Sequence, residues 1–271
     1  MLELTKRLLQ AAEGGDPVLL ASVLEPGPAP LVPGNRLLVE ASGERLGTLG
    51  DPALDDLVAG YAPDAFRRHG AETLYVVDGR LTNRFTEGAT SIYTEVVEAK
   101  PRFLVVGAGH IGRALAKLGS FLGFHVAVID DREEYADPER VPDAHEVICD
   151  DFEEALKRYP IGSNTYVVLV TRGHKQDELS LRCCLGRGAA YLGMIGSKRR
   201  TSTVLQHLRD EGFDPAELDR VRTPIGLDIG AETPEEIAIS IVAEIIMLRR
   251  GGTGRPMYWR RGPGQPEDAP A

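Results

Sequence analysis

The sequence has few cysteines, and none has a partner at metal-ligand or redox spacing. Only Cys149, Cys183 and Cys184 occur, without a C-x-x-C pair. Such sparse thiols fit a reducing compartment and exclude a disulfide framework. Cys183 and Cys184 are neighbours in an expected helix, so their side chains diverge by about 100° and do not form a metal-ligand pair. H-E-x-x-H, G-x-S-x-G and H-x-E with C-x-x-C are also missing. We therefore predict no metal site, and a zinc protease, a serine hydrolase or a zinc deaminase has no support.

The chain also lacks an excess of positive charge and a long apolar run. Its net charge is −10 and its pI is about 5.2, which argues against broad binding to nucleic acid or to an anionic membrane. Glu3, Lys6 and Arg7 interrupt the apolar residues at the start, unlike a signal peptide. The most apolar late segment, 237–248, spans about 12 residues, which suits a buried helix rather than a membrane span. We expect a cytoplasmic protein.

The patterning of the 271 residues predicts two domains and a tail. Residues 1–98 predict a smaller α+β domain with a largely antiparallel sheet. In residues 99–250 strands alternate with helices, which predicts an α/β, Rossmann-like, doubly wound parallel sheet. Residues 251–271 are rich in Gly, Pro and Arg without a period, which predicts a flexible tail.

The expected elements follow from apolar spacing, turn residues and helix caps. In the first domain they are helices over 2–13 and 51–69, the second broken near 60–63, and strands over 18–24, 36–41, 46–49, 73–77, 81–85 and 91–97, with an Asp-Gly hairpin turn at 78–79. In the second domain they are strands over 103–106, 126–129, 145–149, 165–171 and 189–195, a helix after the first of these, and helices over 151–159, 175–187, 197–211 and from 234 onward.

The run G-A-G-H-I-G follows the first apolar strand of the second domain and resembles a dinucleotide-binding turn. Gly107 permits the tight turn, Gly109 lets the backbone approach a pyrophosphate, and Gly112 lets the helix lie close to the strand. His110 and Ile111 belong to the first helical turn, whose N–H groups face an anion. The alternative is a purely structural strand-turn-helix connection.

Asp130 ends the second strand, roughly 20 residues beyond the glycines, where a carboxylate can accept both ribose hydroxyls of an adenosine. Asp131 and Arg132 follow it directly. This triplet belongs to the predicted cofactor site. Whether it prefers a ribose 2′-hydroxyl or a 2′-phosphate stays open at this point.

The loop after the fourth strand places polar and titratable groups directly after a buried segment. Thr171, Arg172 and His174 are candidate ligand-binding residues here, and His174 is the one candidate general acid or base. The alternative is that Thr171 or Asp177 caps a helix and that His174 is only solvated.

The loop after the fifth strand combines glycine, a hydroxyl group and cations at the start of a helix. Gly196, Ser197, Lys198, Arg199 and Arg200 would bind a phosphate well. The alternative, a solvated basic first turn, is less favourable because cations oppose the helix dipole at that end.

In a doubly wound sheet the ligand lies across the carboxyl ends of the strands. The loops 107–112, 130–132, 171–177 and 193–200 should therefore converge. Asp228 precedes the last helix, and it either holds a ligand or shapes its own loop.

Five sequence runs in residues 102–250 resemble the C-terminal Rossmann domain of the XdhC/CoxI family, accessory proteins of xanthine dehydrogenase and related molybdenum hydroxylases. The runs are VVGAGHIGRALA, VIDDR, VTRGHKQDE, YLGMIGSKRR and PIGLDIGAETPEEIAISIVAEI. The resemblance implies a cytoplasmic dimer that binds the molybdenum cofactor, protects it during sulfuration and hands it to the apo-enzyme. It also implies a xanthine dehydrogenase-type molybdoenzyme as a partner, with a cysteine desulfurase as a second candidate.

The first domain departs from the family pattern at its cysteines. Residues 27–34 are similar to the family's G-S-x-P-R-x-P-G but lack its serine and arginine, and Ala53 stands where G-S-I-G-G-G-C has cysteine. The family's later C-G-G stretch has no cysteine counterpart in residues 85–92. If those thiols handle the cofactor in typical members, this chain cannot do so in the same way.

Three hypotheses remain. The first is a carrier and maturation factor for the molybdenum cofactor, bound as molybdopterin or as its dinucleotide form, whose pyrophosphate suits the glycine turn. The second is an NAD(P)-dependent oxidoreductase that uses the same turn, and the third is a non-catalytic scaffold that binds the molybdoenzyme and no small molecule.

Overall fold

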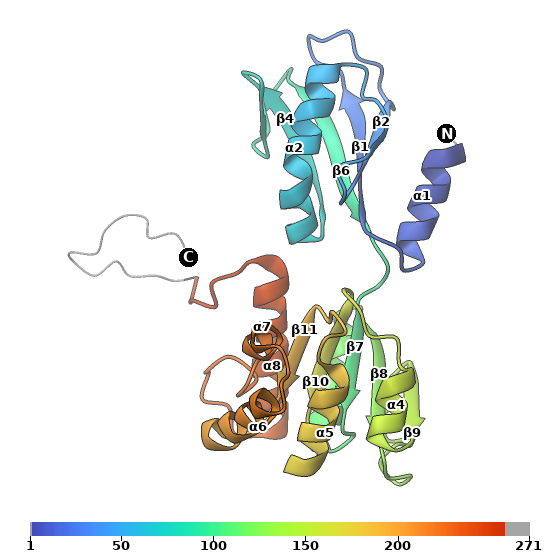
Figure 1. Cartoon of the computed structure of the whole chain (residues 1–271). Coiled ribbons are helices and arrows are strands. Elements are labelled where there is room, and N and C mark those ends of the chain that lie inside the picture. Colours follow the sequence, from blue (N-terminus) through green and yellow to red (C-terminus); the bar gives the residue numbers. More distant parts are fainter. Residues whose placement is uncertain (1, 258–271) are drawn as a thin grey trace, which may run out of the picture. The chain divides into compact units, whose positions relative to one another are not determined.

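The structure, a computed structural model, describes residues 2–257 except the side chain of His174. It divides into two compact units (Figure 1), which are described separately. Among the described residues, the first comprises 2–99 with Arg249–Gly251, and the second comprises 100–248 with 252–257. The expected tail, 251–271, lies outside the described residues from 258 onward.

The first unit is an antiparallel sheet with one helix on each face. The strand order is β3-β2-β1-β6-β4-β5, and every pairing is antiparallel. The elements are α1 (Leu2–Ala12), β1 (Val18–Glu25), β2 (Arg36–Glu40), β3 (Arg45–Gly47), α2 (Pro52–Arg68), β4 (Ala71–Val77), β5 (Arg80–Thr82) and β6 (Thr90–Val97).

Alternation along β1 explains why both faces of this sheet are covered. Leu19 and Ala21 belong to the cluster that packs under α2, whereas Val18 and Leu20 pack with residues of α1. Because successive strand side chains point to opposite faces, an almost continuously apolar strand requires cover on both sides.

Helix α2 runs without interruption, so the expected break near residues 60–63 is wrong. Leu54, Val58, Ala62 and Ala65 are buried along one face of α2. Packing of this face stabilises the helix across Pro63, although proline removes one helical hydrogen bond. The hairpin prediction is confirmed, because Asp78 and Gly79 both have positive φ, as a type I′ turn requires.

The second unit is a five-stranded parallel sheet with helices on both faces, so the predicted fold class is confirmed. Its strand order is β11-β10-β7-β8-β9, and every pairing is parallel. The elements are β7 (Arg102–Val106), α3 (His110–Phe121), β8 (His125–Asp130), β9 (Glu146–Cys149), α4 (Phe152–Arg158), β10 (Thr165–Leu169), α5 (His174–Cys184), β11 (Tyr191–Met194), α6 (Lys198–Asp210), α7 (Pro215–Arg220) and α8 (Pro234–Arg250).

Strand β7 is buried on both faces. Phe103 and Val105 pack with α3 and α8, whereas Leu104 and Val106 pack with α4, α5, α6 and α7. The chain order reverses between β7 and β10, and in open parallel sheets ligands bind at the carboxyl ends of the strands where this reversal occurs.

The helix α8 begins at residue 234, as predicted, and side chains cap its start. The Glu236 N–H donates to Thr233 Oγ1 at 3.3 Å, and Glu236 Oε2 accepts from the Thr233 N–H at 3.0 Å. This reciprocal pair is a capping box. The short helix α7, which begins at Pro215 after the N-cap Asp214, was not predicted.

None of the helices in residues 2–257 combines the length and the apolar character that crossing a bilayer requires.

Two helix-interior glycines should respond in opposite ways to alanine. A Cβ at Gly119 would lie 2.4 Å from a ring carbon of Phe103, whereas a Cβ at Gly60 has no atom within 4 Å. We expect Gly119→Ala to lower the free energy of unfolding by about 1–3 kcal/mol through overpacking. Gly60→Ala should raise it by roughly 0.5–1 kcal/mol through helix propensity. Urea denaturation of both variants checks this, and equal effects would contradict the packing described for α3.

Candidate functional site

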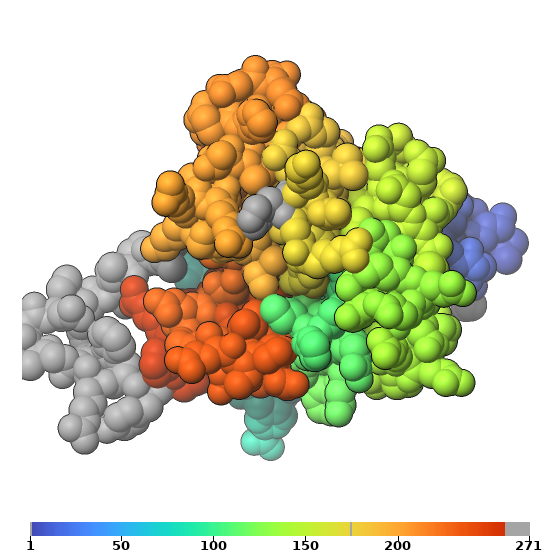
Figure 2. Space-filling view, turned by 90° about the horizontal axis from the view of Figure 1, so that it is seen from below, coloured from blue at the N-terminus to red at the C-terminus, as the bar shows by residue number. Residues whose placement is uncertain are grey.

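The loops that follow the parallel strands come together on one face of the second unit. Figure 2 looks onto this face, where the green segment after β7, the yellow segment after β10 and the orange segment after β11 reach the surface near one another. The parallel direction of all five strands places these loops at the same edge. This edge is the candidate site.

The glycine turn has three glycines with three different surroundings. Gly107 has φ +111°, and a Cβ there would lie 2.5 Å from the carbonyl oxygen of Val170 at the end of β10. A Cβ on Gly112 would lie 1.9 Å from the Gly107 oxygen. By contrast, a Cβ on Gly109 has no atom within 4 Å, so this position faces open space.

Gly109 is the N-cap residue of α3 and offers no side chain to the first turn of the helix. The N–H groups of His110, Ile111 and Gly112 begin the helix and have no carbonyl four residues earlier within it. Exposed N–H groups at a helix start favour an anion. The backbone geometry therefore supplies the donors that the sequence pattern predicts.

Asp130 is only 1% exposed, and its carboxylate is directed at the protein's own donors. Oδ2 accepts from the Ala108 N–H at 2.8 Å and from Arg132 Nη2 at 3.0 Å. Oδ1 accepts from the Arg132 backbone N–H at 3.1 Å and from Arg132 Nε at 2.9 Å. Burial alone would raise the pKa of Asp130, but the hydrogen bonds from Arg132 and Ala108 outweigh it and hold that pKa below its usual value.

Asp131 and Arg172 link the loops on either side of β7. Arg172 Nη2 lies 3.0 Å from Asp131 Oδ2. Asp131 follows β8 and Arg172 follows β10, and β7 lies between these strands in the sheet. The ion pair therefore connects the two loops that flank the glycine turn.

The loop after β10 is organised by Asp177. The Thr171 N–H and hydroxyl group donate to Asp177 Oδ1 at 3.2 and 2.6 Å. Gly173 is the N-cap of α5, and Asp177 lies within the helix, so neither Thr171 nor Asp177 occupies the cap position itself. His174 begins α5, and its side chain, the candidate general acid or base, lies outside the described structure.

A cavity of about 230 Å³ opens between the ends of β10 and β11. Thr171, Arg172, Gly196 and Arg200 line it. Arg200 also lines a second cavity of about 420 Å³, with Ser197 and Arg199. The candidate residues of two loops thus surround one space.

Helix α6 begins with the cations Lys198, Arg199 and Arg200, all of which are exposed. Ser197 is the N-cap, yet its side chain makes no cap hydrogen bond. Within residues 2–257 none of these three cations forms an ion pair. Positive charge at this end of a helix is unfavourable by itself and becomes favourable beside an anion.

Glu244 on α8 positions the loop of Asp228. It is 9% exposed, and its Oε2 accepts from the Tyr191 hydroxyl at 2.5 Å and from the Gly226 N–H at 2.9 Å. Burial and the neighbouring Glu244 raise the pKa of Tyr191. Asp228 itself is exposed. Sequence reasoning missed Glu244, and its one signal was a carboxylate inside an otherwise apolar helix.

Sequence profiles match both units of the chain. The profile of the XdhC Rossmann domain matches residues 103–245, which is more than half of the 271 residues. The profile of the XdhC and CoxI family matches residues 11–77. The chain belongs to the XdhC and CoxI family. The resemblance seen in the sequence is therefore confirmed.

Three relatives share parts of this XdhC/CoxI chain. The uncharacterized protein YqeB of Escherichia coli is 30% identical over 227 residues, which cover 81% of this chain and 41% of YqeB. A protein of Bacillus subtilis, described as a probable subunit of xanthine dehydrogenase, is 34% identical over 161 residues, with coverages of 59% and 47%. The molybdenum cofactor insertion chaperone PaoD of E. coli is 28% identical over 89 residues, with coverages of 33% and 28%. The chain thus spans less than half of the length of each relative.

A crystal structure described as a xanthine dehydrogenase from Bacillus halodurans is similar to this chain. The likeness covers 92% of this chain and 96% of the crystallised chain. Its TM-score is 0.54 and its sequence identity is 21%. At this identity the likeness shows the fold alone.

The thiols of this XdhC/CoxI member differ in accessibility. Cys149 is exposed at the end of β9, next to Asp130 in the parallel register. Burial raises the pKa of Cys184 to about 12 and also raises the pKa of Cys183. Ala53 lies in the first turn of α2, where its N–H donates to the cap residue Asp51.

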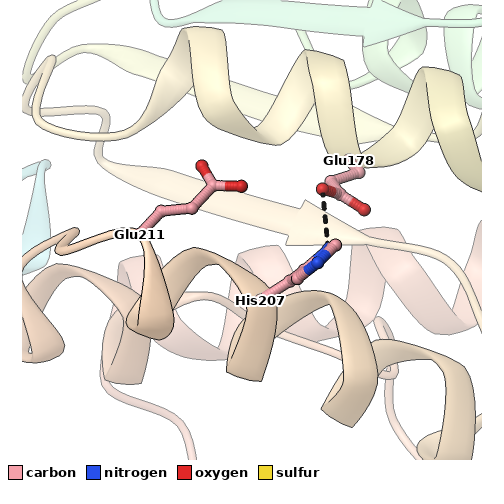
Figure 3. A group of neighbouring side chains, drawn as sticks. All are labelled: Glu178, His207 and Glu211. Carbon is pink, nitrogen blue, oxygen red and sulfur yellow. Dashed lines mark ion pairs between the residues drawn. The ribbon is translucent and has the colours of Figure 1, made fainter.

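One cluster on α5 and α6 has donor groups that suit a metal ion. Glu178, His207 and Glu211 bring one potential ligand atom each within 4.8 Å of one another. In Figure 3 Glu178 and His207 point toward each other, and Nδ1 to Oε1 is 3.4 Å. Arg182 Nη2 also lies 2.9 Å from Glu178 and 3.0 Å from Glu211, so its guanidinium compensates both carboxylates. The cluster is an ion-pair network between the two helices.

We expect Asp130→Asn to destabilise the second unit in a pH-dependent way. Removing one partner of a buried ion pair costs about 3–5 kcal/mol at pH 7. Because the folded-state pKa of Asp130 is lowered, its contribution is present above the unfolded value of about 3.9 and is lost as pH falls through the folded value. The difference in unfolding free energy between wild type and variant should therefore shrink below about pH 4.

Urea denaturation between pH 7 and pH 3 measures this difference. Asp143→Asn, an exposed carboxylate of the same unit, is the control and should change stability by less than about 0.5 kcal/mol. A cost for Asp130→Asn that stays constant down to pH 3 would show that ionisation of Asp130 does not stabilise the fold.

Proposed function

We propose that this protein is an accessory protein that carries the molybdenum cofactor and delivers it to a xanthine dehydrogenase-type molybdoenzyme. The observation that carries the proposal is the open side of Gly109, next to a helix start whose N–H groups are available to an anion. The cofactor is cargo in this role, so the protein needs to bind it and shield it rather than transform it.

The residues at the carboxyl edge fit the phosphate of such a cargo. A phosphate or pyrophosphate approaches closely only where no Cβ intervenes, and Gly109 meets that condition. Lys198, Arg199 and Arg200 add positive charge, and none of the three forms an ion pair within the described residues. Guanidinium and ammonium groups are the usual phosphate ligands in proteins.

The cargo would be held from two sides. The glycine turn with His110 and Ile111 would bind the phosphate end, and the cavity between β10 and β11 would receive a further part of the ligand through Thr171, Arg172, Gly196 and Arg200. The bound cofactor brings the molybdenum centre that the client enzyme uses. His174 and Asp228 remain candidate contacts at the rim.

The names of two relatives support this role. One relative is a cofactor insertion chaperone and another is a probable subunit of xanthine dehydrogenase. We infer a cytoplasmic homodimer whose partner is a molybdoenzyme, with a cysteine desulfurase as a second candidate. Because the family cysteine is replaced by Ala53, we assign sulfur handling to the partner or to the exposed Cys149.

We expect Gly109→Val to abolish cargo retention without harming the fold. The valine side chain meets no protein atom at Cβ but occupies the space that the ligand needs. Native mass spectrometry of protein purified from a host that makes the cofactor measures the bound mass. Gly162→Val is the matched control, because a Cβ at Gly162 also has no atom within 4 Å and Gly162 precedes β10 at the opposite edge.

A molybdopterin mass on wild type and Gly162→Val, with none on Gly109→Val, supports the proposal. A nicotinamide dinucleotide without any pterin would overturn it and make a hydride-transfer assay the next step. Wild type without a bound pterin in that host would also count against carriage.

We expect Arg200→Gln to weaken cargo retention by about tenfold, the usual effect of one charge-assisted hydrogen bond. Arg200 lines both cavities at the start of α6. Arg209→Gln is the control, since Arg209 lies near the other end of α6 and pairs with Asp219. The rate of cofactor loss on dilution measures both variants. Equal loss from the two would show that the start of α6 does not contact the cargo.

A further inference from the structure

Arg132 donates hydrogen bonds to the Asp130 carboxylate, the group that would otherwise accept the hydroxyl groups of a ribose diol. A carboxylate offers about four lone-pair positions to donors. Those of Asp130 receive the Ala108 N–H and three donors of Arg132, all at 2.8–3.1 Å. Asp130 is also 1% exposed. No acceptor position is left for the two hydroxyl groups that the carboxylate at this position accepts in an NAD site.

Arg132 is fixed in this arrangement by more than Asp130. Its guanidinium carbon lies 3.5 Å from the centroid of the Tyr135 ring, a cation–π contact. Its Nε lies 3.8 Å from Asp131 Oδ1. A diol could reach Asp130 only by displacing Arg132, and that would leave a buried carboxylate without its cation. Asp130 is therefore a positioning residue for Arg132 and for the glycine turn.

Beside Asp130, the side chains with exposed surface are the guanidinium groups of Arg132 and Arg172 and the Asp131 carboxylate that pairs with both. The side chain of Arg132 is 23% exposed and that of Arg172 is 49% exposed. Guanidinium matches a phosphate in charge and in shape, and an arginine near this position accommodates the 2′-phosphate of NADP in Rossmann proteins. A ligand with phosphate here gains charge-assisted hydrogen bonds, whereas a free diol finds no buried acceptor.

We infer that this site selects ligands that carry a phosphate, rather than a free ribose diol, beside Arg132. The inference rests on the proposed function, because it concerns the same glycine turn. It narrows the cargo to a pterin with a terminal phosphate, in preference to a dinucleotide form whose ribose would present its diol to Asp130. It also disfavours NAD as a ligand of the turn.

The test uses NAD⁺ and NADP⁺, a pair of probes that differ by one phosphate. Calorimetric titration is done on the full-length protein purified from a host that cannot make the molybdenum cofactor. We expect NADP⁺ to bind at least about tenfold more tightly than NAD⁺, the effect of one charge-assisted hydrogen bond. Binding at the turn is verified by its loss in Gly109→Val.

Two variants change Arg132, and a third is the matched control. Arg132→Ala frees the acceptors of Asp130, and Arg132→Lys keeps the charge but cannot make the two-pronged contact, so it serves if the alanine variant unfolds. Both should lower the ratio of NADP⁺ to NAD⁺ affinity. Arg140→Ala should leave the ratio unchanged, because Arg140 lies over the same Tyr135 ring at 5.6 Å but does not contact Asp130.

Three results would overturn the inference: equal or tighter binding of NAD⁺ by wild type, a ratio that neither Arg132 variant changes, and no binding of either nucleotide at millimolar concentration. None of them decides the carrier function, which the pterin mass tests separately. A missing pterin mass combined with NADP⁺ preference would overturn the carrier function and leave the phosphate selectivity in place.

Discussion

The hydrogen bonds to the Asp130 carboxylate hold the candidate site together. One carboxylate at the end of β8 fixes the glycine turn through the Ala108 N–H and fixes Arg132 through two guanidinium nitrogens. Because the group is buried and negative, each donor lost leaves an unfavourable charge in the interior. The position of the loop that carries Arg172 also depends on this strand end, since Arg172 pairs with Asp131, the residue after Asp130.

The fold could be predicted from the sequence because the sequence patterns that specify it are local. The glycine turn, the capping box at Thr233 and the Asp78-Gly79 hairpin each need only a few neighbouring residues. The alternation of strands and helices after residue 102 predicted the parallel sheet for the same reason. Pro63 misled the prediction because packing of one helix face, which involves distant strands, outweighs a local helix breaker.

The chemistry of the site was harder to predict from the sequence because it depends on the directions in which side chains point. The sequence correctly predicts that Asp130 lies at a strand end. It does not predict that the carboxylate points toward the Ala108 N–H, which is 22 residues away. Glu244 lies 53 residues from Tyr191 and 18 from Gly226, so only the fold reveals that it supports the loop of Asp228. Contacts of this kind leave no periodic pattern in a sequence.

Helix α6 has charges opposed to its dipole at its start, where three cations occupy the first turn, whereas Arg209 in the last turn counters Glu211 at the C-cap. Packing of Thr201, Val204 and Leu208 therefore has to stabilise a helix that the cations of its first turn weaken. An anion bound at the start of α6 would remove part of this repulsion. Binding of the ligand would then also stabilise the helix, so the free energies of ligand binding and of local helix stability would be linked. Release of the ligand would then destabilise α6. A partner that takes the ligand would have to compensate for the lost binding free energy and for the lost stability of the helix.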